Sequence, residues 1–265
     1  MLRSLYSGIS GMKNFQTKLD VVANNISNVN TAGFKKSRVT FKDIVSQQIS
    51  GASASTANKG SVNGKQVGLG STIASIDTVH SPASTGTTGR DLDIAITGDG
   101  YFRVGTGNEV SYTRYGNFQL SDQGYLTTAD GLFVLQADDQ KIQIPMDNAK
   151  SYSIGPDGTV SYVDKNTNNS VKVGQISLAT FSNAAGLTKT GDNLYRESLS
   201  SGTPQIVAPG EGSAGALQTG ALEMSNVDLS EEFSEMIIAQ RGFQSNAKII
   251  TTSDEILQEL VNLKR

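Results

Sequence analysis

Apolar residues recur at alternating three- and four-residue steps near both ends of the chain, and no such pattern lies between them. Most positions in the two series are apolar, although the whole chain is only 37% hydrophobic. This spacing is typical of a helix that buries one side, as in a coiled coil. We therefore expect one long helix at each end. The two series are Leu2, Leu5, Ile9, Met12, Gln16, Leu19, Ala23, Ile26, Asn30, and Leu229, Phe233, Met236, Gln240, Phe243, Ala247, Ile250, Asp254, Leu257, Val261, Lys264.

Local signals mark where these helices begin and end. The first should run from about Leu2 to about Val29, because a run of asparagines and then Gly33 disfavours further helix. The second should begin after Asp228, since Asp228 followed three residues later by Glu231 is an acidic form of the capping box.

The middle of the chain has a different pattern, with short alternating runs such as Leu92, Ile94 and Ile96 separated by turn sequences such as Gly98-Asp99-Gly100. Such runs predict an all-β body of short antiparallel strands. The fold class is therefore α+β, with terminal helices that pair in a coiled-coil-like domain. The expected domains are a helical domain of residues 1–45 and 225–265, a flexible connector of residues 46–66 rich in Ser, Ala and Gly, and a β-rich domain of residues 67–224.

The apolar side of each terminal helix must be buried against another surface, so self-assembly is the first hypothesis. Two simpler alternatives to self-assembly remain open. The helices could form a two-helix hairpin that serves only as a stalk, or the same side chains could form an ordinary core within one chain. The residues that we expect to pack together on these helices, within or between subunits, are Leu5, Ile9, Met12, Leu19, Ile26, Phe233, Met236, Phe243, Ile250 and Leu257.

Composition narrows the classes of partner. A formal net charge of −3 and a pI near 5.3 give no indication of a nucleic-acid partner, and no apolar run is long enough to insert into a membrane. The absence of cysteine excludes disulfides and thiolate metal sites. The amino terminus lacks the continuous apolar segment of a secretion signal, so export would not involve a cleaved signal peptide.

The sequence shows few candidate catalytic residues, and we expect that the protein is not an enzyme and binds neither a cofactor nor a metal. The glycine-rich segments lack the remainder of a nucleotide-binding motif and are better explained as turns. Asp91 and Asp93 could form a carboxylate pair, but the strand pattern places them in water. His80, the single histidine, has no evident partner. A cell-surface adhesin-like β protein, or less plausibly a glycan hydrolase, is the competing class.

Three separated segments resemble the signatures of the flagellar rod and hook protein family. They are LDVVANNISNVNTAGFK at 19–35, GDGYF at 98–102 with YTRYGNF at 112–118, and LEMSNVDL at 222–229 continuing into MIIAQRGFQSNA at 236–247. Within that family the chain looks more similar to hook proteins, through Val67 to Gly70 and Thr88 to Ile96, than to distal rod proteins. The motif residues that we single out are Asn24, Asn25, Asn28, Gly33, Phe34, Ser225, Asn226 and Val227.

The resemblance implies a structural subunit of the bacterial flagellum, exterior to the cell. It also implies that the terminal helices come together as an inner domain, whose packing residues form the inner layer of a tube, and that the β-rich middle forms an outer domain. Many copies would form the tubular hook, which transmits motor torque as a flexible joint around an export channel, while the alternative is a distal rod subunit that acts as a rigid drive shaft. Implied partners are further copies of the chain, rod and hook-filament junction proteins, the hook cap and the flagellar export apparatus. At 265 residues any additional outer domain must be small, near 137–169.

Two further expectations follow from the resemblance. Residues 46–61 are expected to distinguish hook from rod, because in rods the equivalent connector is thought to lock neighbouring subunits. Phe41 and Val45 have the spacing of a segment thought to dock at the export gate. Packing between the two layers is the simpler explanation for Phe41, since a Phe followed by an apolar residue four positions later is common.

Overall fold

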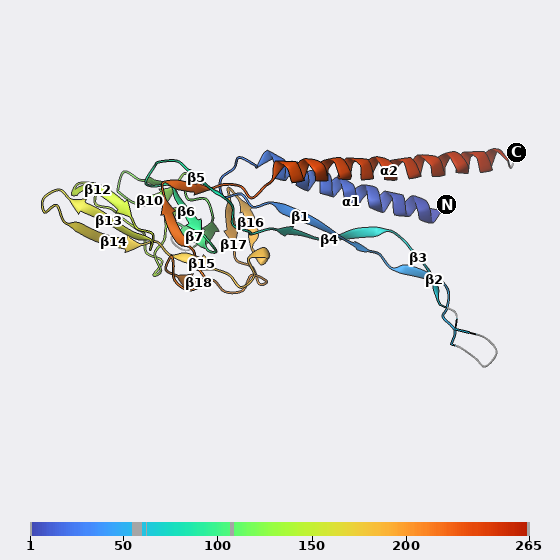
Figure 1. Ribbon diagram of the computed structural model, residues 1–265, viewed down its shortest axis with the longest axis horizontal. Helices are drawn as coiled ribbons and strands as arrows, with labels where there is room; N and C mark the ends of the chain where they lie inside the picture. The colour runs from blue at the N-terminus through green and yellow to red at the C-terminus, as the bar shows by residue number, and fades with distance from the viewer. Residues whose placement is uncertain (1, 55–59, 62, 107–108, 264–265) are drawn as a thin grey trace. The chain divides into compact units, whose positions relative to one another are not determined.

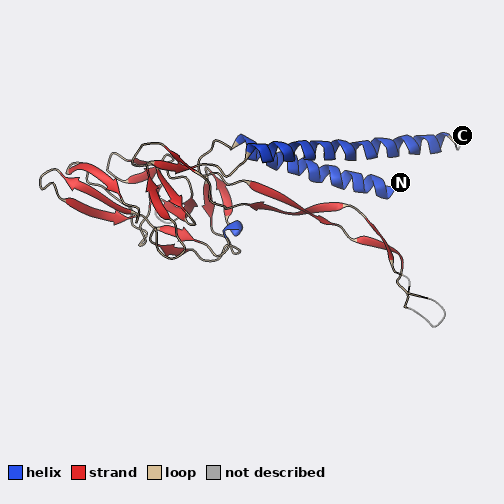
Figure 2. Cartoon of the chain, viewed as in Figure 1, coloured by secondary structure: helices blue, strands red, loops and turns tan. Residues whose placement is uncertain are grey.

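The structure, a computed structural model, describes residues 2–54, 60–61, 63–106 and 109–263. Long helices lie at the two ends of the chain, and strands that pair antiparallel with one another lie between them, which confirms the α+β class (Figure 2). The chain divides into two compact units. Unit 1 comprises Met1–Ser27, Ser37–Thr78 and Asp228–Arg265, and unit 2 comprises Asn28–Lys36 and Val79–Val227.

Unit 1 contains two antiparallel helices and a long ribbon of strands. Helix α1 (Leu2–Ser27) lies between helix α2 (Leu229–Asn262) and the ribbon (Figure 1). The ribbon begins with β1 (Ser37–Asp43) paired to β4 (Ser71–Thr78), and it continues through β2 (Ser46–Ser50) paired to β3 (Lys65–Gly68).

The helix ends agree with the local signals in the sequence. The Asp228 side chain accepts hydrogen bonds from the backbone nitrogens of Ser230 and Glu231 at 2.8 and 3.4 Å, which confirms the predicted cap of α2. Such a cap satisfies backbone donors that have no partner within the helix. Helix α1 ends at Ser27, two residues earlier than expected. The chain then turns through Gly33, whose φ of +72° is readily adopted by glycine.

The prediction that residues 46–66 form a connector without regular structure is wrong in part. Residues 46–50 and 65–68 form a paired ribbon, and residues 67–78 belong to unit 1 and not to the β body. The side chains of β2 and β3 are exposed. Backbone hydrogen bonds can pair such polar strands without the apolar alternation on which a sequence prediction depends. The flexibility expected of residues 46–66 stays a prediction, and within that segment residues 55–59 and 62 lie outside the described residues.

Unit 2 is built around a sheet that includes β7, β8, β9, β10, β11 and β15–β18. Gly220, with φ of +73°, separates β19 from β20. The strand bounds in unit 2 are β5 (Thr85–Thr87), β6 (Ile94–Thr97), β7 (Tyr101–Gly105), β8 (Val110–Thr113), β9 (Phe118–Leu120), β10 (Leu126–Thr128), β11 (Phe133–Val134), β12 (Ala149–Ile154), β13 (Thr159–Asp164), β14 (Ser170–Gln175), β15 (Leu178–Thr180), β16 (Thr188–Gly191), β17 (Leu194–Arg196), β18 (Gln205–Val207), β19 (Ala216–Thr219) and β20 (Ala221–Glu223); a short 3-10 helix, η1, covers Ala184–Gly186.

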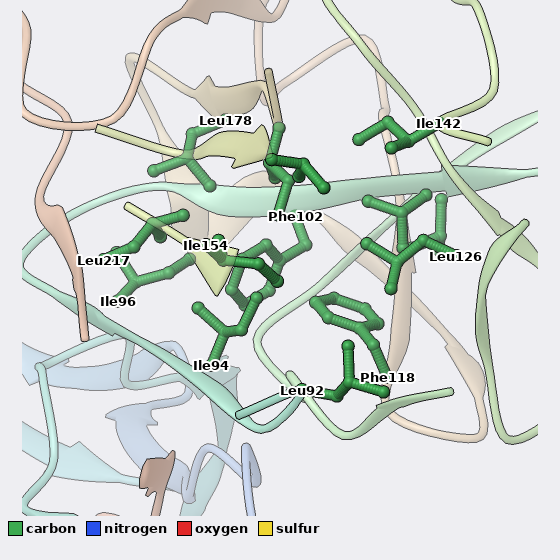
Figure 3. Packing of buried hydrophobic residues seen from close by; sticks show 14 of the residues in the cluster. Leu92, Ile94, Ile96, Phe102, Phe118, Leu126, Ile142, Ile154, Leu178 and Leu217 are labelled. Carbon is green, nitrogen blue, oxygen red and sulfur yellow. The ribbon is translucent and has the colours of Figure 1, made fainter. Parts of the chain in front are cut away.

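The core of unit 2 gathers apolar side chains from strands far apart in the sequence (Figure 3). Phe102 on β7 packs edge-to-face on Phe118 of β9, with ring centroids 5.0 Å apart. Ile94 and Leu178 also reach this cluster and have no exposed surface. Leu92, Ile94 and Ile96 therefore all reach the core as predicted, but the residues between them, Asp93 and Ala95, are buried as well, so the segment does not alternate between core and solvent.

Candidate assembly site

The two helices of unit 1 meet in one antiparallel register. Asn25 donates to the Glu232 carboxylate at 3.1 Å. Ten residues earlier on α1, the ring of Phe15 lies over Gly242, ten residues later on α2. Toward the start of α1, Gly11 faces Asn246. Because each step back along α1 is matched by an equal step forward along α2, the pair is in register over most of α1.

Glycines allow the two backbones to come close at the centre of this pair. A Cβ added at Gly242 would lie 2.6 Å from Cζ of Phe15, and one added at Gly11 would lie 2.7 Å from the side-chain oxygen of Asn246. Both distances are shorter than van der Waals contact, so larger residues would displace the facing side chains. Phe15 also contacts Phe41 of the ribbon, with centroids 6.2 Å apart. The spacing pattern did not reveal these glycines because it counted only apolar side chains.

The buried side chains of the helical unit are mostly polar. Asn25 donates to the backbone oxygen of Ser37 at 2.9 Å and accepts from its nitrogen at 3.0 Å, so a single amide fixes the start of β1 to α1. Asn14 donates to the Ser71 hydroxyl of β4 at 2.9 Å. Buried polar groups need such partners, because an unpaired one costs about 1–3 kcal/mol. Asn25 was singled out as a motif residue, and the structure gives it this positioning role.

Most of the residues predicted to form the inner layer are half-buried. Contacts within one chain therefore cover their side chains only in part. Ile250 lies against Gly8, 3.4 Å from the position of an added Cβ. Phe233 departs from the prediction and is 50% exposed, because the side of α2 that faces α1 is rotated from the predicted series. Val22 and Ala239, which the prediction did not single out, are buried. The half-buried residues are Leu5, Ile9, Met12, Leu19, Ile26, Met236, Phe243, Ile250 and Leu257.

Large apolar side chains of α2 remain exposed on the sides that α1 does not cover. We call this set the uncovered face of α2. Isolated exposed apolar residues are ordinary on a protein surface, whereas a contiguous exposed apolar patch is typical of an interaction surface. Its members are Leu229, Phe233, Ile237, Ile238, Ile249, Ile256, Leu260, Val261 and Leu263.

Within unit 2, the other motif residues hold three chain segments together. The Glu223 carboxylate accepts from Lys35 Nζ at 2.6 Å, from the Ala83 nitrogen at 3.1 Å and from Arg114 at 3.1 Å. Glu223, Lys35 and Arg114 are all almost fully buried. Asn226 accepts from the Lys36 nitrogen at 2.7 Å and donates to the Val79 oxygen at 2.8 Å.

This cluster also explains the two motif residues that precede Lys35. A Cβ added at Gly33 would lie 2.9 Å from the backbone nitrogen of Tyr115, so only glycine fits there without displacement. Phe34 is nearly buried, and Lys189 Nζ lies 5.1 Å from the centre of its ring. Burial lowers the pKa of Lys35, and the Glu223 carboxylate acts against that shift. The sequence singled out Gly33, Phe34 and Asn226 but missed Glu223, the centre of the cluster.

His80 differs from the expectation, because it has a partner. Its Nδ1 shares a hydrogen bond with the Tyr101 hydroxyl at 2.5 Å, and its ring packs edge-on to Tyr195. Burial lowers the pKa of His80 to about 4, and the positive charges of Lys35, Lys189 and Arg114 add to the effect. Burial also raises the pKa of Tyr195 to about 12. The imidazole is therefore neutral in the folded state near pH 7.

The remaining candidates show no arrangement for catalysis. Asp91 is exposed, but Asp93 is 4% exposed and lies 3.7 Å from Arg90, so the prediction that both carboxylates lie in water is wrong for Asp93. The strand begins at Ile94, and Asp93 is held inside by an isolated bridge to Asn117. Gly98 and Gly100 have φ of +138° and +125°, as their interpretation as turn residues suggests.

Phe41 and Val45, the export candidates, lie on the ribbon of unit 1. Phe41 is on β1 and 40% exposed, whereas Val45 follows β1 and is 77% exposed. Among the described residues, no group of His, Cys, Asp and Glu is arranged to hold a metal ion. None of the helices described is both long and apolar enough to cross a membrane.

Comparison with known proteins supplies the family. The domain described as "Flagellar hook protein FlgE/F/G D1 domain" matches residues 95–162. "Flagella basal body rod protein" matches residues 5–35, and "Flagellar basal body rod FlgEFG protein C-terminal" matches residues 218–263. These three regions include most of the motif residues and most of both helices.

Curated relatives match along the whole chain. The flagellar basal-body rod protein FlgG of Bacillus subtilis (strain 168) is 64% identical over 266 residues, with all of both chains covered. FlgG of Borreliella burgdorferi is 38% identical over 271 residues, also with full coverage. The flagellar hook protein FlgE of Borreliella burgdorferi is 30% identical over an alignment of 441 residues that spans both chains. This chain therefore belongs to the flagellar rod and hook protein family of structural proteins.

Proposed function

We propose that this protein is a distal rod subunit of the bacterial flagellum, many copies of which form a straight tube that transmits torque and encloses the export channel. The sequence prediction favoured the hook, but the comparisons support the rod. The alignment with FlgG of Bacillus subtilis is 266 residues long, nearly the length of this chain. The alignment with the hook protein needs 441 residues to cover both chains, so that hook protein is much longer. A chain of 265 residues lacks the additional material of that hook protein.

The observation that carries the proposal is the uncovered face of α2. One side of α2 packs on α1, while apolar residues such as Ile238 and Ile249, 56% and 43% exposed, remain on other sides. Removing such apolar surface from water is favourable by about 25 cal/mol per Å², before the costs of association are subtracted. When a patch on one copy binds a different patch on the next copy, and the rotation between copies does not close a ring, the copies form a helical tube.

The ribbon of unit 1 supports a rigid rod over a flexible hook. The β2–β3 part is two strands wide, and its side chains are exposed. An isolated two-stranded ribbon is marginally stable in water, so this part needs a neighbouring surface to hold it in place. If that surface belongs to adjacent copies, the ribbon links them and opposes sliding.

Electron microscopy of purified protein tests both parts of the proposal. We expect long straight tubes from the native chain, and none from Ile238→Gln/Ile249→Gln, because the substituted side chains are polar. The matched control is Leu199→Gln, which changes a fully exposed leucine of unit 2 and should leave tubes intact. Bent tubes would favour the hook, and a native chain that never assembles would refute the assembly role.

The proposed neighbours are further copies of the chain, rod proteins and the hook-side proteins that follow them, including junction and cap proteins. The subunit would be delivered to the cell exterior by the flagellar export apparatus without a cleaved signal peptide. Phe41 and Val45 remain the proposed export-gate segment. Phe41→Ala should reduce secretion, and if it instead abolishes tube formation by purified protein while secretion continues, the packing role is correct.

A further inference from the structure

A cleft of about 260 Å³ opens in unit 2 beside the start of β7. Segments far apart in the sequence form its wall, with Tyr101 on β7, Arg114 just after β8 and Thr180 on β15. His80 and Asp99 also line it. Pockets for drug-sized ligands measure roughly 300–1,000 Å³, so this cleft has the size for a smaller molecule.

Arg114 in this wall has hydrogen-bonding capacity that the fold does not use. Its side chain is almost fully buried, and its Nη1 donates to the Glu223 carboxylate at 3.1 Å. Its Cζ lies 5.2 Å from the centre of the Tyr101 ring. Among the described residues, Arg114 Nε has no hydrogen-bond partner. Because a buried donor without a partner costs free energy, a group that accepts hydrogen bonds here would stabilise the fold.

A second unpaired nitrogen belongs to the same cleft. The Nδ1 atom of His80 shares a hydrogen bond with the Tyr101 hydroxyl at 2.5 Å, while its Nε2 is buried and has no partner in the part of the chain that the structure describes. Burial raises the pKa of Tyr101, so its hydroxyl keeps the proton and donates it to Nδ1. The neutral imidazole then carries its own proton on Nε2, which makes Nε2 a second buried donor.

The charges near these two residues leave a small positive balance. Besides burial, the positive charges of Lys35, Lys189 and Arg114 lower the pKa of His80. The carboxylates of Glu223 and Asp99 add to the raised pKa of Tyr101, which burial mainly causes. Three positive and two negative side chains leave a net charge of about +1, which suits a monoanion better than a dianion. A carboxylate also offers two coplanar oxygens that match the N–H fork of a guanidinium.

We propose that this cleft binds a small carboxylate anion, whose oxygens accept hydrogen bonds from Arg114 Nε and His80 Nε2. The inference is independent of the assembly role, since the cleft lies within unit 2 of a single chain. Phe181, which packs edge-on to Tyr101 with centroids 5.9 Å apart, gives the cleft an apolar wall for the remainder of the ligand. The bound anion stabilises unit 2, because it binds the folded chain and not the unfolded one.

The site can be observed directly, because His80 is the single histidine of the chain. The test uses the full chain, labelled in its histidine and kept at a concentration too low for assembly. At constant pH near 7 and constant ionic strength, acetate should shift the imidazole signals of the nuclear magnetic resonance spectrum saturably, whereas chloride should not. Protonation does not contribute to the shift, since the pKa of His80 is about 4.

Variants locate the binding site in the cleft. Ala184, a half-buried residue of its wall, becomes larger in Ala184→Leu, which fills the cleft and should abolish the acetate shift. Ala208→Leu makes the same change at a half-buried alanine outside this cleft, and as the matched control it should retain the shift. Arg114→Lys keeps a positive charge beside Glu223 but loses the guanidinium fork, and it should weaken acetate binding by about tenfold or more.

Three results would overturn the proposal. Equal shifts with acetate and chloride would show that the cleft holds only water, and an acetate shift that persists in Ala184→Leu would place the anion elsewhere. Tighter binding of inorganic phosphate than of acetate would show that the site does not select a carboxylate. Circular dichroism establishes that each variant folds, and if Ala184→Leu does not, unchanged acetate affinity in Arg114→Lys refutes the site.

Discussion

Unit 2 has a large buried apolar core, whereas the few buried side chains in the described part of unit 1 are mostly polar. In unit 2, large apolar side chains such as Phe102 and Ile94 are fully buried. In the described part of unit 1, Val22 and Ala239 are the only apolar side chains that are buried, while Asn14, Asn25, Glu232 and Ser253 are buried as well. Several large apolar residues of α2, such as Phe233 and Ile238, are exposed.

This difference indicates that the β body is complete as a single chain and the helical unit is not. A buried apolar core supplies most of the stability of a domain. The helices of unit 1 instead use hydrogen bonds and close glycine contacts to fix a register, which specifies a geometry without burying much apolar surface. Under the proposed function, further copies would supply that burial, because a long helix depends on lateral packing.

The largest expected effect is at the buried charges of unit 2. Glu223→Gln leaves Lys35 and Arg114 buried with no carboxylate, and breaking such a group costs about 3–5 kcal/mol. Urea unfolding followed by near-ultraviolet circular dichroism of the buried tyrosines measures the loss. Glu211→Gln, at an exposed position, is the matched control. An equally small change in both variants would show that the cluster does not hold the unit together.

The same change of side chain should have opposite consequences in the two units. Ile94→Ala creates a cavity in the core of unit 2 and should cost about 2–5 kcal/mol of unfolding free energy. Ile238→Ala, at an exposed position, should change monomer stability by at most about 0.5 kcal/mol and should instead raise the protein concentration needed for assembly. If both variants destabilise the monomer equally, the contrast between the units is wrong.

Close packing of the helix pair can be tested at Gly242. Gly242→Ala places a methyl group against Phe15 and should destabilise the pair by about 1–3 kcal/mol, although alanine is the better helix former. Thermal melting followed by the helical signal measures it. Adding Phe15→Leu should restore part of the loss, because it removes the ring that is displaced. A stabilised single variant would mean that the register does not depend on this contact.

The smallest effect concerns pH. His80 has a pKa of about 4 when folded and 6.5 as its ordinary value, so the unfolded chain binds the proton first as the pH falls. Its contribution to stability is present in full above about pH 6.5 and is lost as the pH drops toward about 4. His80→Gln should flatten this part of the unfolding profile of unit 2. An unchanged slope would show that folding does not lower the pKa of His80.

The sequence by itself determined what depends on local periodicity and on short signals. The α+β class, both helices and the cap at Asp228 follow from apolar spacing and from hydrogen-bonding side chains, because these act within a few residues. The inward position of Leu92, Ile94 and Ile96 follows from the same alternation. The ribbon of β2 and β3 could not be predicted, since its polar side chains carry no such pattern.

Only the tertiary structure decided which side of each helix is covered and which buried groups belong together. The pairing of α1 with α2 depends on contacts such as Phe15 with Gly242, which join residues more than two hundred positions apart. Glu223 gains its role because the fold brings Lys35 and Arg114 to one carboxylate in a site without water access. Long-range contacts of this kind depend on the packing of whole elements, and spacing along the chain does not specify them.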